Sequence, residues 1–187
     1  LQLYAIDQIR FEKALPLYSL IACSGSGEIL DLYDRVTPEN DLDWTAPEGE
    51  WTIYALFTGW HGKLTERAGP GGEGDVIDHF SGRAVDNFLH HFDTVFKDYD
   101  INSLRGYFND SYEVDDAQGQ ADWTSELFYE FFIRRGYNLG ANLAALFQKD
   151  DPEKNARVLS DYRQTIADLI LEKFTTHWTQ WTNRQGK

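Results

Sequence analysis

Three polar side chains follow one short apolar segment of the sequence and could carry acid–base chemistry. Residues 104–109 are expected to form a β-strand that ends at Asn109, and Asp110 and Glu113 come after it. β/α barrels place such side chains at strand ends, and a pair of carboxyl groups is what cleavage of a glycosidic bond requires. The residues alone leave a second interpretation open, in which Asp110 caps an ordinary turn and Glu113 is solvated.

A second group of candidate ligand contacts lies in and after a glycine-rich stretch, residues 67–79. Its glycines allow the backbone to approach a ligand closely and to adopt positive φ angles. The stretch lacks the Lys-Ser/Thr ending of a phosphate loop, and Glu73 would repel a phosphate. Glu73, Asp78 and His79 are therefore candidates to bind another kind of ligand. A solvated loop acid at Glu73, and a satisfied pair at a strand end for Asp78 and His79, remain alternative interpretations.

A metal site is also possible from the same side chains. Asp78, Asp110 and Glu113 offer hard oxygen ligands, and His79 lies beside the first of them. Because the sequence has no soft cluster of cysteines and histidines, these ligands indicate calcium rather than zinc, with Asp110 as the first candidate ligand. The sequence also lacks a Gly-x-Ser-x-Gly motif, which disfavours a serine hydrolase.

The composition limits the class of protein and of partner. Hydrophobic residues make up 42% of the 187 residues and aromatic residues 15%, which excludes disorder outside short loops. The formal net charge of −14 argues against nucleic acid and against an anionic membrane surface as partners, and it favours a neutral or cationic ligand. No run approaches the roughly 20 apolar residues of a membrane helix, and no signal peptide is visible.

The aromatic residues suit a carbohydrate ligand, because the C–H faces of sugars stack on aromatic rings. Most of these rings are expected in the core. Trp44, Trp60 and Trp123 lie in polar, loop-like context and are the better candidates for ligand contacts. The one cysteine, Cys23, cannot form a disulfide within the chain, so the sequence neither shows nor excludes secretion.

The composition and the hydrophobic period of the sequence change along the chain. The first part is rich in strand formers and turns, and the period becomes helical from Ser81, a candidate N-cap. The pattern predicts an α/β fold, part of a (β/α) TIM-like barrel with parallel pairing and a β-rich N-terminal segment. The expected domains are a β-rich segment over 1–70 and a partial catalytic barrel over 71–187. The expected strands are 17–23, 51–57 and 104–109, and the expected helical segments are 84–96, 125–135, 138–147 and a long helix from 152 towards Trp181.

Four motifs, in this order, resemble one family of enzymes. They are Asp43-Trp-Thr-Ala-Pro-Glu-Gly-Glu-Trp-Thr-Ile-Tyr-Ala-Leu-Phe57, Pro70-Gly-Gly-Glu-Gly74 with Val76-Ile-Asp-His-Phe-Ser81, Tyr107-Phe-Asn-Asp-Ser-Tyr-Glu113, and Arg157-Val-Leu-Ser-Asp-Tyr-Arg163. Together they span nearly the whole chain and look like the catalytic region of family 106 glycoside hydrolases, the α-L-rhamnosidases.

The resemblance implies a large secreted or periplasmic bacterial enzyme that releases L-rhamnose with inversion, on a (β/α) barrel with a calcium-assisted site. Carried over to this sequence, Glu113 would be a catalytic carboxylate. Five other residues would line the sugar or metal site: Glu73, Asp78, His79, Asn109 and Asp110.

The sequence departs from a complete inverting site, because such a site needs two carboxyl groups about 6.5–9.5 Å apart. After Glu113 the chain offers long amphipathic helices and no second strand-end acid. The partner acid is therefore expected outside this chain, and whether Glu113 is the acid or the base stays open. The expected partners are a carbohydrate substrate and the remainder of a longer polypeptide, and the isolated chain is expected to be inactive.

Two other functions remain open at this point. One is a non-catalytic carbohydrate-binding module in which Trp60, Trp123 and Glu73 hold a glycan. The other is a retaining β-glycosidase of the barrel type, with Asn109 or Asp110 and Glu113 around its acid/base. A second strand that ends in Glu or Asp would favour an enzyme over a binding module.

Overall fold

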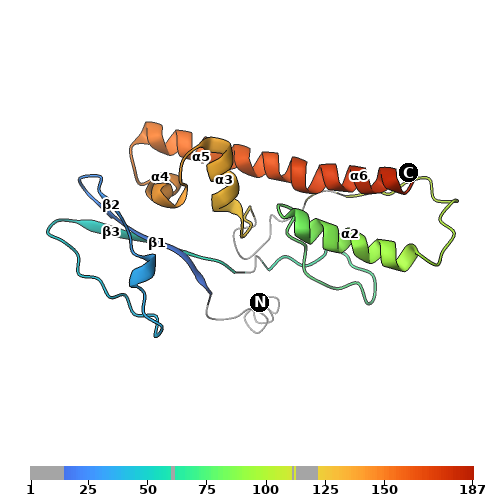
Figure 1. The fold of residues 1–187 in the computed structure, drawn as a ribbon, viewed down its shortest axis with the longest axis horizontal. Helices are drawn as coiled ribbons and strands as arrows, with labels where there is room; N and C mark the ends of the chain where they lie inside the picture. Colours follow the sequence, from blue (N-terminus) through green and yellow to red (C-terminus); the bar gives the residue numbers. More distant parts are fainter. Residues whose placement is uncertain (1–14, 60–61, 111, 113–121) are drawn as a thin grey trace. The chain divides into compact units, whose positions relative to one another are not determined.

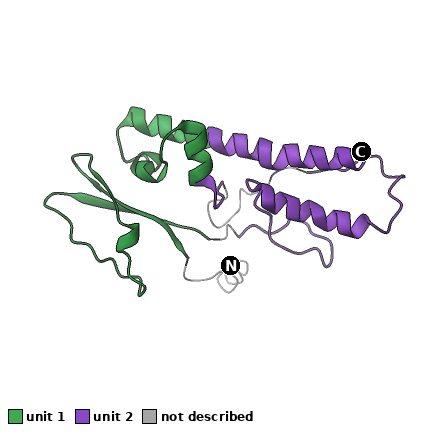
Figure 2. Ribbon diagram, in the orientation of Figure 1, with its two compact units in different colours: residues 1–60, 128–163 green, residues 61–127, 164–187 purple. Residues whose placement is uncertain are grey.

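The computed structural model describes residues 15–59, 62–110, 112 and 122–187, which form two compact units (Figure 1). Unit 1 comprises residues 1–60 and 128–163, and unit 2 comprises residues 61–127 and 164–187 (Figure 2). Helices and strands are both present, so the chain is of the α/β class. The expected domain division at residue 70 stays a prediction.

Unit 1 contains a three-stranded antiparallel sheet of order β2-β1-β3. Its strands are β1 (Leu17–Ser24), β2 (Ile29–Asp31) and β3 (Trp51–Phe57), which confirms the two strands expected in this region. β1 is the central strand because Ile21 pairs with Asp31 on one side and with Tyr54 on the other. The tight turn after β1 uses Gly27 at a φ of 92°, a conformation that glycine adopts without strain.

One face of this sheet carries a small hydrophobic core of Leu20, Ala22 and Leu32. Trp44 and Trp51 pack against it with their rings edge to face, 5.7 Å between centroids. Trp44 was expected to contact a ligand because its neighbours in the sequence are polar. The indole ring is partly buried against the sheet, and a ligand contact at Trp44 stays a prediction.

Short helices complete unit 1. They are η1 (Tyr33–Arg35), α3 (Leu127–Arg135), η2 (Gly140–Asn142), α4 (Leu143–Leu146) and the first part of α5 (Pro152–Leu169). The helical segments contact the sheet through aromatic pairs, Tyr18 with Phe128 and Tyr54 with Phe147. Gly140 is buried against Phe128, where a Cβ atom would lie 2.9 Å from the ring. Only glycine fits at that position without movement of the ring.

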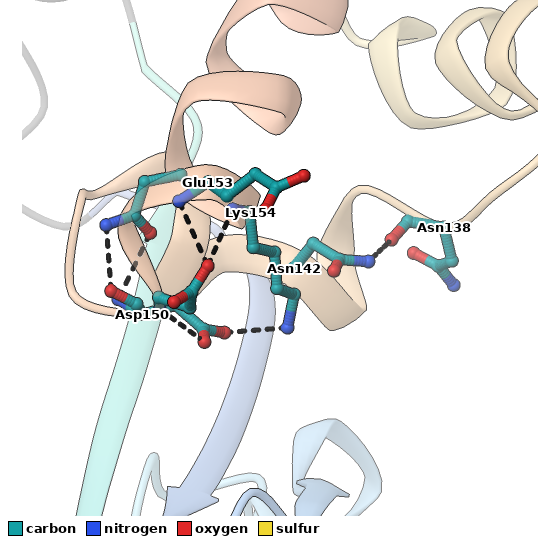
Figure 3. A network of polar contacts seen from close by, with 7 residues as sticks. Asn138, Asn142, Asp150, Glu153 and Lys154 are labelled. Atoms are coloured by element: carbon teal, nitrogen blue, oxygen red, sulfur yellow. Dashed lines mark hydrogen bonds and ion pairs between the residues drawn. The ribbon is translucent and has the colours of Figure 1, made fainter.

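Side chains around the start of α5 hold that end of the helix (Figure 3). The carboxylate of Asp151 accepts hydrogen bonds from the backbone N–H groups of Glu153 and Lys154, at 3.0 and 3.2 Å. Asp150 forms an ion pair with Lys154, with 2.6 Å between Oδ2 and Nζ. This arrangement satisfies N–H groups that the helix itself leaves without partners.

Unit 2 is built around α2 (Gly82–Phe96), the π-helical segment η3 (Ile170–Thr175) and α6 (Thr176–Arg184). Ser81 is the N-cap of α2, because its hydroxyl accepts a hydrogen bond from the backbone N–H of Ala84. The buried core consists of Val85, Leu89, Phe174 and Trp181. The expected helix behind Ser81 is therefore confirmed.

A single carboxylate ties α6 to α2 inside unit 2. Asp93 Oδ1 accepts a hydrogen bond from the indole Nε1 of Trp181 at 2.7 Å and another from the Gln185 amide at 2.9 Å. Trp181 is 2% exposed, so its indole N–H needs a partner inside the protein. Asp93 provides that partner.

One expectation about local structure is wrong. Residues 104–109 are not a strand, and no described residue pairs with them as a strand neighbour. The parallel pairing expected for the helix–strand–helix part of a barrel stays a prediction. A strand needs a hydrogen-bonded neighbour, and Phe108 in this segment is 86% exposed. In α3, Phe131 is buried but Phe132 is 54% exposed, because adjacent helical residues point about 100° apart. Across the described residues, no helix is long and apolar enough to cross a membrane.

Candidate functional site

The glycine-rich stretch forms a hairpin-like loop in unit 2. Its two arms are joined by backbone hydrogen bonds from Thr65 to Gly74, at 2.8 Å, and from Val76 to Lys63, at 3.0 Å. A short turn closes the far end, where the N–H of Gly72 donates to the carbonyl of Gly69. The loop is therefore held at its base, and its tip carries residues 66–73.

Two residues of the tip have positive φ angles, Gly71 at 82° and Arg67 at 48°. Glycine adopts this conformation readily, whereas a residue with a long side chain pays about 1–3 kcal/mol for it. The strain at Arg67 persists because the paired arms of the loop fix the backbone on both sides. Strained residues of this kind cluster at ligand sites.

The segment after the loop leads into α2, and Asp78 stabilises the turn before that helix. Asp78 Oδ1 accepts a hydrogen bond from the backbone N–H of Phe80 at 2.9 Å, and the N–H of Ser81 donates to the Asp78 carbonyl. Ser81 then caps α2. One oxygen of the Asp78 carboxylate therefore shapes the turn that starts the helix.

His79 is held in a defined orientation by its backbone and by aromatic rings. Its Nδ1 lies 3.0 Å from the carbonyl oxygen of Ile77. Because a carbonyl only accepts, this bond requires the proton on Nδ1 and leaves the lone pair of the neutral ring on Nε2. The rings of Tyr112 and Phe174 pack edge-on against the imidazole, with centroids 4.9 and 4.6 Å away.

A cavity of about 450 Å³ lies between this loop and the acidic segment near residue 110. Its volume is within the range of small-molecule sites, about 300–1,000 Å³. All of its lining residues belong to unit 2. They are Lys63, Thr65, Glu66, Arg67, Val76, His79, Asp110 and Tyr112.

The charged groups of this pocket are not equivalent. Lys63 is only 6% exposed, and its Nζ lies 2.9 Å from Glu66 Oε2, so the two charges offset each other. Arg67 is exposed, and none of the described residues makes a hydrogen bond or ion pair with its side chain. Asp110 brings a carboxylate to the same cavity. The lining of the pocket thus includes a cation, a carboxylate and an oriented imidazole.

The structure brings together some of the residues singled out in the sequence. His79 and Asp110 line the same pocket although they are far apart in the chain. Asn109 donates a hydrogen bond from its amide to the Asp110 carbonyl at 2.8 Å, which supports the backbone beside the pocket. The lining does not include Glu73, Asp78, Asn109 or Trp123, and Glu113 and Trp60 lie outside the described residues.

Sequence reasoning did not single out Lys63, Glu66, Arg67 and Tyr112 as site residues. Arg67 and Tyr112 lie inside the two motifs that drew attention, so their place in those motifs was the available signal. Lys63 and Glu66 are three residues apart, a spacing that carries no special meaning outside a helix. Their pairing becomes visible only in the folded loop.

A calcium site is not formed by the described residues alone. Within residues 15–59, 62–110, 112 and 122–187, no three His, Cys, Asp or Glu side chains lie together as metal ligands. Asp110 lines the pocket, one oxygen of Asp78 is engaged in a turn, and Glu113 lies outside the described part. Calcium therefore stays a prediction.

Comparison with known proteins decides the family. The model of glycoside hydrolase family 106, described as alpha-L-rhamnosidase, matches residues 12–186. The chain belongs to glycoside hydrolase family 106. The resemblance noted in the four sequence motifs is thereby confirmed, and three of those motifs contribute to the loops and helix starts around the pocket or to the sheet of unit 1.

A relative of this family 106 chain is a protein of Formosa agariphila named "Putative beta-glucuronidase". The two are 31% identical over 165 residues, which cover 85% of this chain and 14% of the relative. No solved structure matches the chain. Because the chain spans such a small share of the relative, the activity and substrates of a whole protein are treated below as proposals.

Proposed function

We propose that this family 106 chain is part of a glycoside hydrolase that removes terminal α-L-rhamnose from a polysaccharide or glycoside. The observation that carries the proposal is the match of the alpha-L-rhamnosidase family model to residues 12–186. The pocket of unit 2 supports it, because its volume suits a sugar and its polar groups could bind hydroxyls. The proposed reaction inverts the anomeric configuration and uses two carboxyl groups.

Glu113 is the proposed catalytic carboxylate from this chain. The support for this assignment is the motif Tyr107–Glu113, in which the resemblance to the family makes Glu113 a catalytic carboxylate. In an inverting mechanism one carboxyl group protonates the leaving oxygen while the other activates water on the opposite face of the sugar. The second carboxyl group is proposed to come from a part of the protein outside these residues.

Asp110 and His79 have proposed roles in holding the sugar. A carboxylate at Asp110 can accept hydrogen bonds from two neighbouring hydroxyl groups, a common way to fix a sugar ring. His79 lines the pocket, and its Nδ1 donates to the Ile77 carbonyl. The aromatic packing of His79 keeps that ring in one orientation.

The proposal includes the features that only the family resemblance implies. These are a (β/α) barrel completed by further chain, a calcium-assisted site and a periplasmic or secreted location. Calcium is supported by the oxygen donors Asp78, Asp110 and Glu113. Removal of metal by a chelator should lower the activity of the full-length protein, and calcium should restore it better than zinc. Unchanged activity after exhaustive dialysis against EDTA would remove calcium from the proposal.

A second candidate function is a glycosidase that acts on β-glucuronides. The name of the Formosa agariphila relative favours it. It belongs to the class of barrel-type β-glycosidases that the sequence left open. Hydrolysis of an aryl β-D-glucuronide, with no hydrolysis of an aryl α-L-rhamnoside, would favour this candidate over the first.

The test uses the full-length natural protein that carries this sequence. It should hydrolyse an aryl α-L-rhamnoside, and proton NMR should show β-L-rhamnose as the first product, as inversion requires. The variant Glu113→Gln keeps the shape of the side chain but cannot transfer a proton, so turnover should fall by about 10²- to 10⁴-fold. Glu126→Gln, at an exposed position before α3, is the matched control. Near-normal turnover of Glu113→Gln would remove Glu113 from the mechanism.

A further inference from the structure

The guanidinium of Arg67 is a cation at the pocket with no partner among the described residues. The other basic side chain of the lining differs, because Lys63 is buried and paired with Glu66 at 2.9 Å. Asp110 also lines the cavity. Nothing within the described chain therefore accounts for an arginine at this position.

The backbone at Arg67 adds a second, independent observation. Its φ of 48° is a conformation that glycine would adopt more easily, and glycines occupy several neighbouring positions of the same loop. The hydrogen-bonded arms of the loop hold Arg67 in this strained conformation beside the cavity. Strain in a residue that lines a pocket is a reason to look for a ligand of its side chain.

The chemistry of the guanidinium limits what that ligand can be. Its five N–H donors lie in one plane and match a carboxylate with two parallel hydrogen bonds. The protein as a whole has a formal net charge of −14, so a free small anion is repelled from a distance. We therefore expect the anionic group to be part of a sugar, because contacts of the sugar with the other pocket residues can offset this repulsion.

We propose that Arg67 binds the carboxylate of a uronic acid, so that the substrate of this pocket is an acidic rather than a neutral saccharide. The inference rests on the proposed function and specifies the substrate of the same site. The cavity of about 450 Å³ has room for a sugar unit that carries such a group. The uronic acid is either the sugar next to the released rhamnose or the released sugar itself, and the experiment separates these two positions.

The experiment measures kcat/KM of the full-length protein on three substrates. They are a disaccharide of α-L-rhamnose on D-glucuronic acid, the methyl ester of that disaccharide, and an aryl β-D-glucuronide. The acid and its ester differ in the charge of one group and in the methyl group that the ester carries there. A preference for the acid over the ester that depends on Arg67 is the expected result.

Variants then assign the preference to one side chain. Arg67→Gln should lower kcat/KM for the acidic disaccharide by about tenfold to a hundredfold, as expected when hydrogen bonds to a charged group are lost. It should lower kcat/KM for the methyl ester by a clearly smaller factor, because a neutral ester carbonyl accepts a weaker hydrogen bond than a carboxylate. Arg67→Lys keeps the charge but not the planar donor pair, so its value should fall between the other two. Arg83→Gln removes an exposed arginine outside the pocket lining, which controls for the change in net charge.

Each outcome decides the inference separately from the proposed function. Equal loss on the acid and the ester, or no loss on either, would overturn the assignment of Arg67 even if rhamnose is released. If no rhamnoside is hydrolysed, the proposed function fails, and hydrolysis of the aryl glucuronide with the same dependence on Arg67 still supports the inference.

If neither substrate is hydrolysed, calorimetric titration with D-glucuronate and D-glucose decides. Equal affinity for the two sugars would overturn the inference, and tighter binding of glucuronate that Arg67→Gln abolishes would support it.

Discussion

The two units of this chain treat their polar side chains differently. In unit 1 the polar groups satisfy one another: Asp150 pairs with Lys154, and the Tyr137 hydroxyl donates to Asp161 at 2.7 Å. In unit 2 the pocket is lined by Arg67, which has no partner among the described residues, and by Asp110. We propose that these polar groups of unit 1 serve stability, whereas the Arg67 side chain in unit 2 serves a ligand.

Three side chains of unit 1 have shifted pKa values: Tyr137, Asp150 and Cys23. Burial raises the pKa of the Tyr137 phenol, and the hydrogen bond to Asp161 raises it further. The hydrogen bond from Lys154 holds the pKa of the Asp150 carboxyl below its usual value. Burial raises the pKa of the Cys23 thiol, and the negative charge of Asp150 adds to that effect. All three pKa shifts arise from burial or from contacts with other groups of unit 1.

The largest expected effect on stability lies in the core of unit 2. Trp181→Ala should lower the free energy of opening of α2 and α6 by about 3–5 kcal/mol, because it removes a buried aromatic ring and leaves a cavity. Hydrogen exchange of the full-length protein, followed by mass spectrometry of peptides from the two helices, measures this loss. Protection in β1 serves as the reference from unit 1. Unchanged exchange in α2 would show that Trp181 does not hold the two helices together.

A smaller effect is expected when only the carboxylate that joins α2 and α6 is removed. Asp93→Ala leaves the buried Trp181 indole N–H without an acceptor, which should cost about 1–3 kcal/mol. The same hydrogen-exchange measurement applies, with Asp98→Ala as an exposed control on the segment that follows α2. If both variants exchange alike, the hydrogen bond between Asp93 and Trp181 contributes nothing measurable.

The smallest expected effect concerns the ion pair at the start of α5 in unit 1. The pKa of Asp150 is lowered in the folded protein, so the pair stabilises the fold above the ordinary carboxyl pKa of 3.8, and this stabilisation is lost as the pH falls below that value. Because both side chains are partly exposed, Asp150→Asn should cost no more than about 0.5–1 kcal/mol near neutral pH. The difference in the exchange of α5 peptides between variant and wild type should therefore be present at pH 6 and should shrink as the pH is lowered below 3.8. A difference that does not shrink with falling pH would contradict an electrostatic origin.

Local sequence patterns predicted those elements whose stability is itself largely local. The helix behind Ser81 follows from a cap and an apolar repeat, and the end of α3 follows from Gly136, which has a φ of 79°. Strands β1 and β3 were predicted from their β-branched and aromatic residues and from the turns between them. In each case the decisive residues lie within the element or next to it.

The patterns failed where the outcome depends on partners elsewhere. Residues 104–109 have the composition of a strand, but no neighbouring strand pairs with them among the described residues. The packing of Trp44 against Trp51 from β3 was likewise not visible from its polar neighbours in the sequence. The meeting of His79 and Asp110 at one pocket was suggested by the family resemblance and not by spacing. The positive φ of Arg67 was not foreseen, because arginine rarely adopts it.

The central claim is that the pocket of unit 2 binds the substrate, and one comparison of variants tests it most directly. Asp110→Asn and Asp98→Asn remove the same charge from unit 2, but only Asp110 lines the cavity. In the full-length protein, kcat/KM for the best glycoside substrate should fall by about tenfold to a hundredfold for Asp110→Asn, because a charged hydrogen-bond acceptor is lost. Asp98→Asn should match the wild type. Equal kcat/KM values for the two variants would contradict the assignment of this pocket as the substrate site.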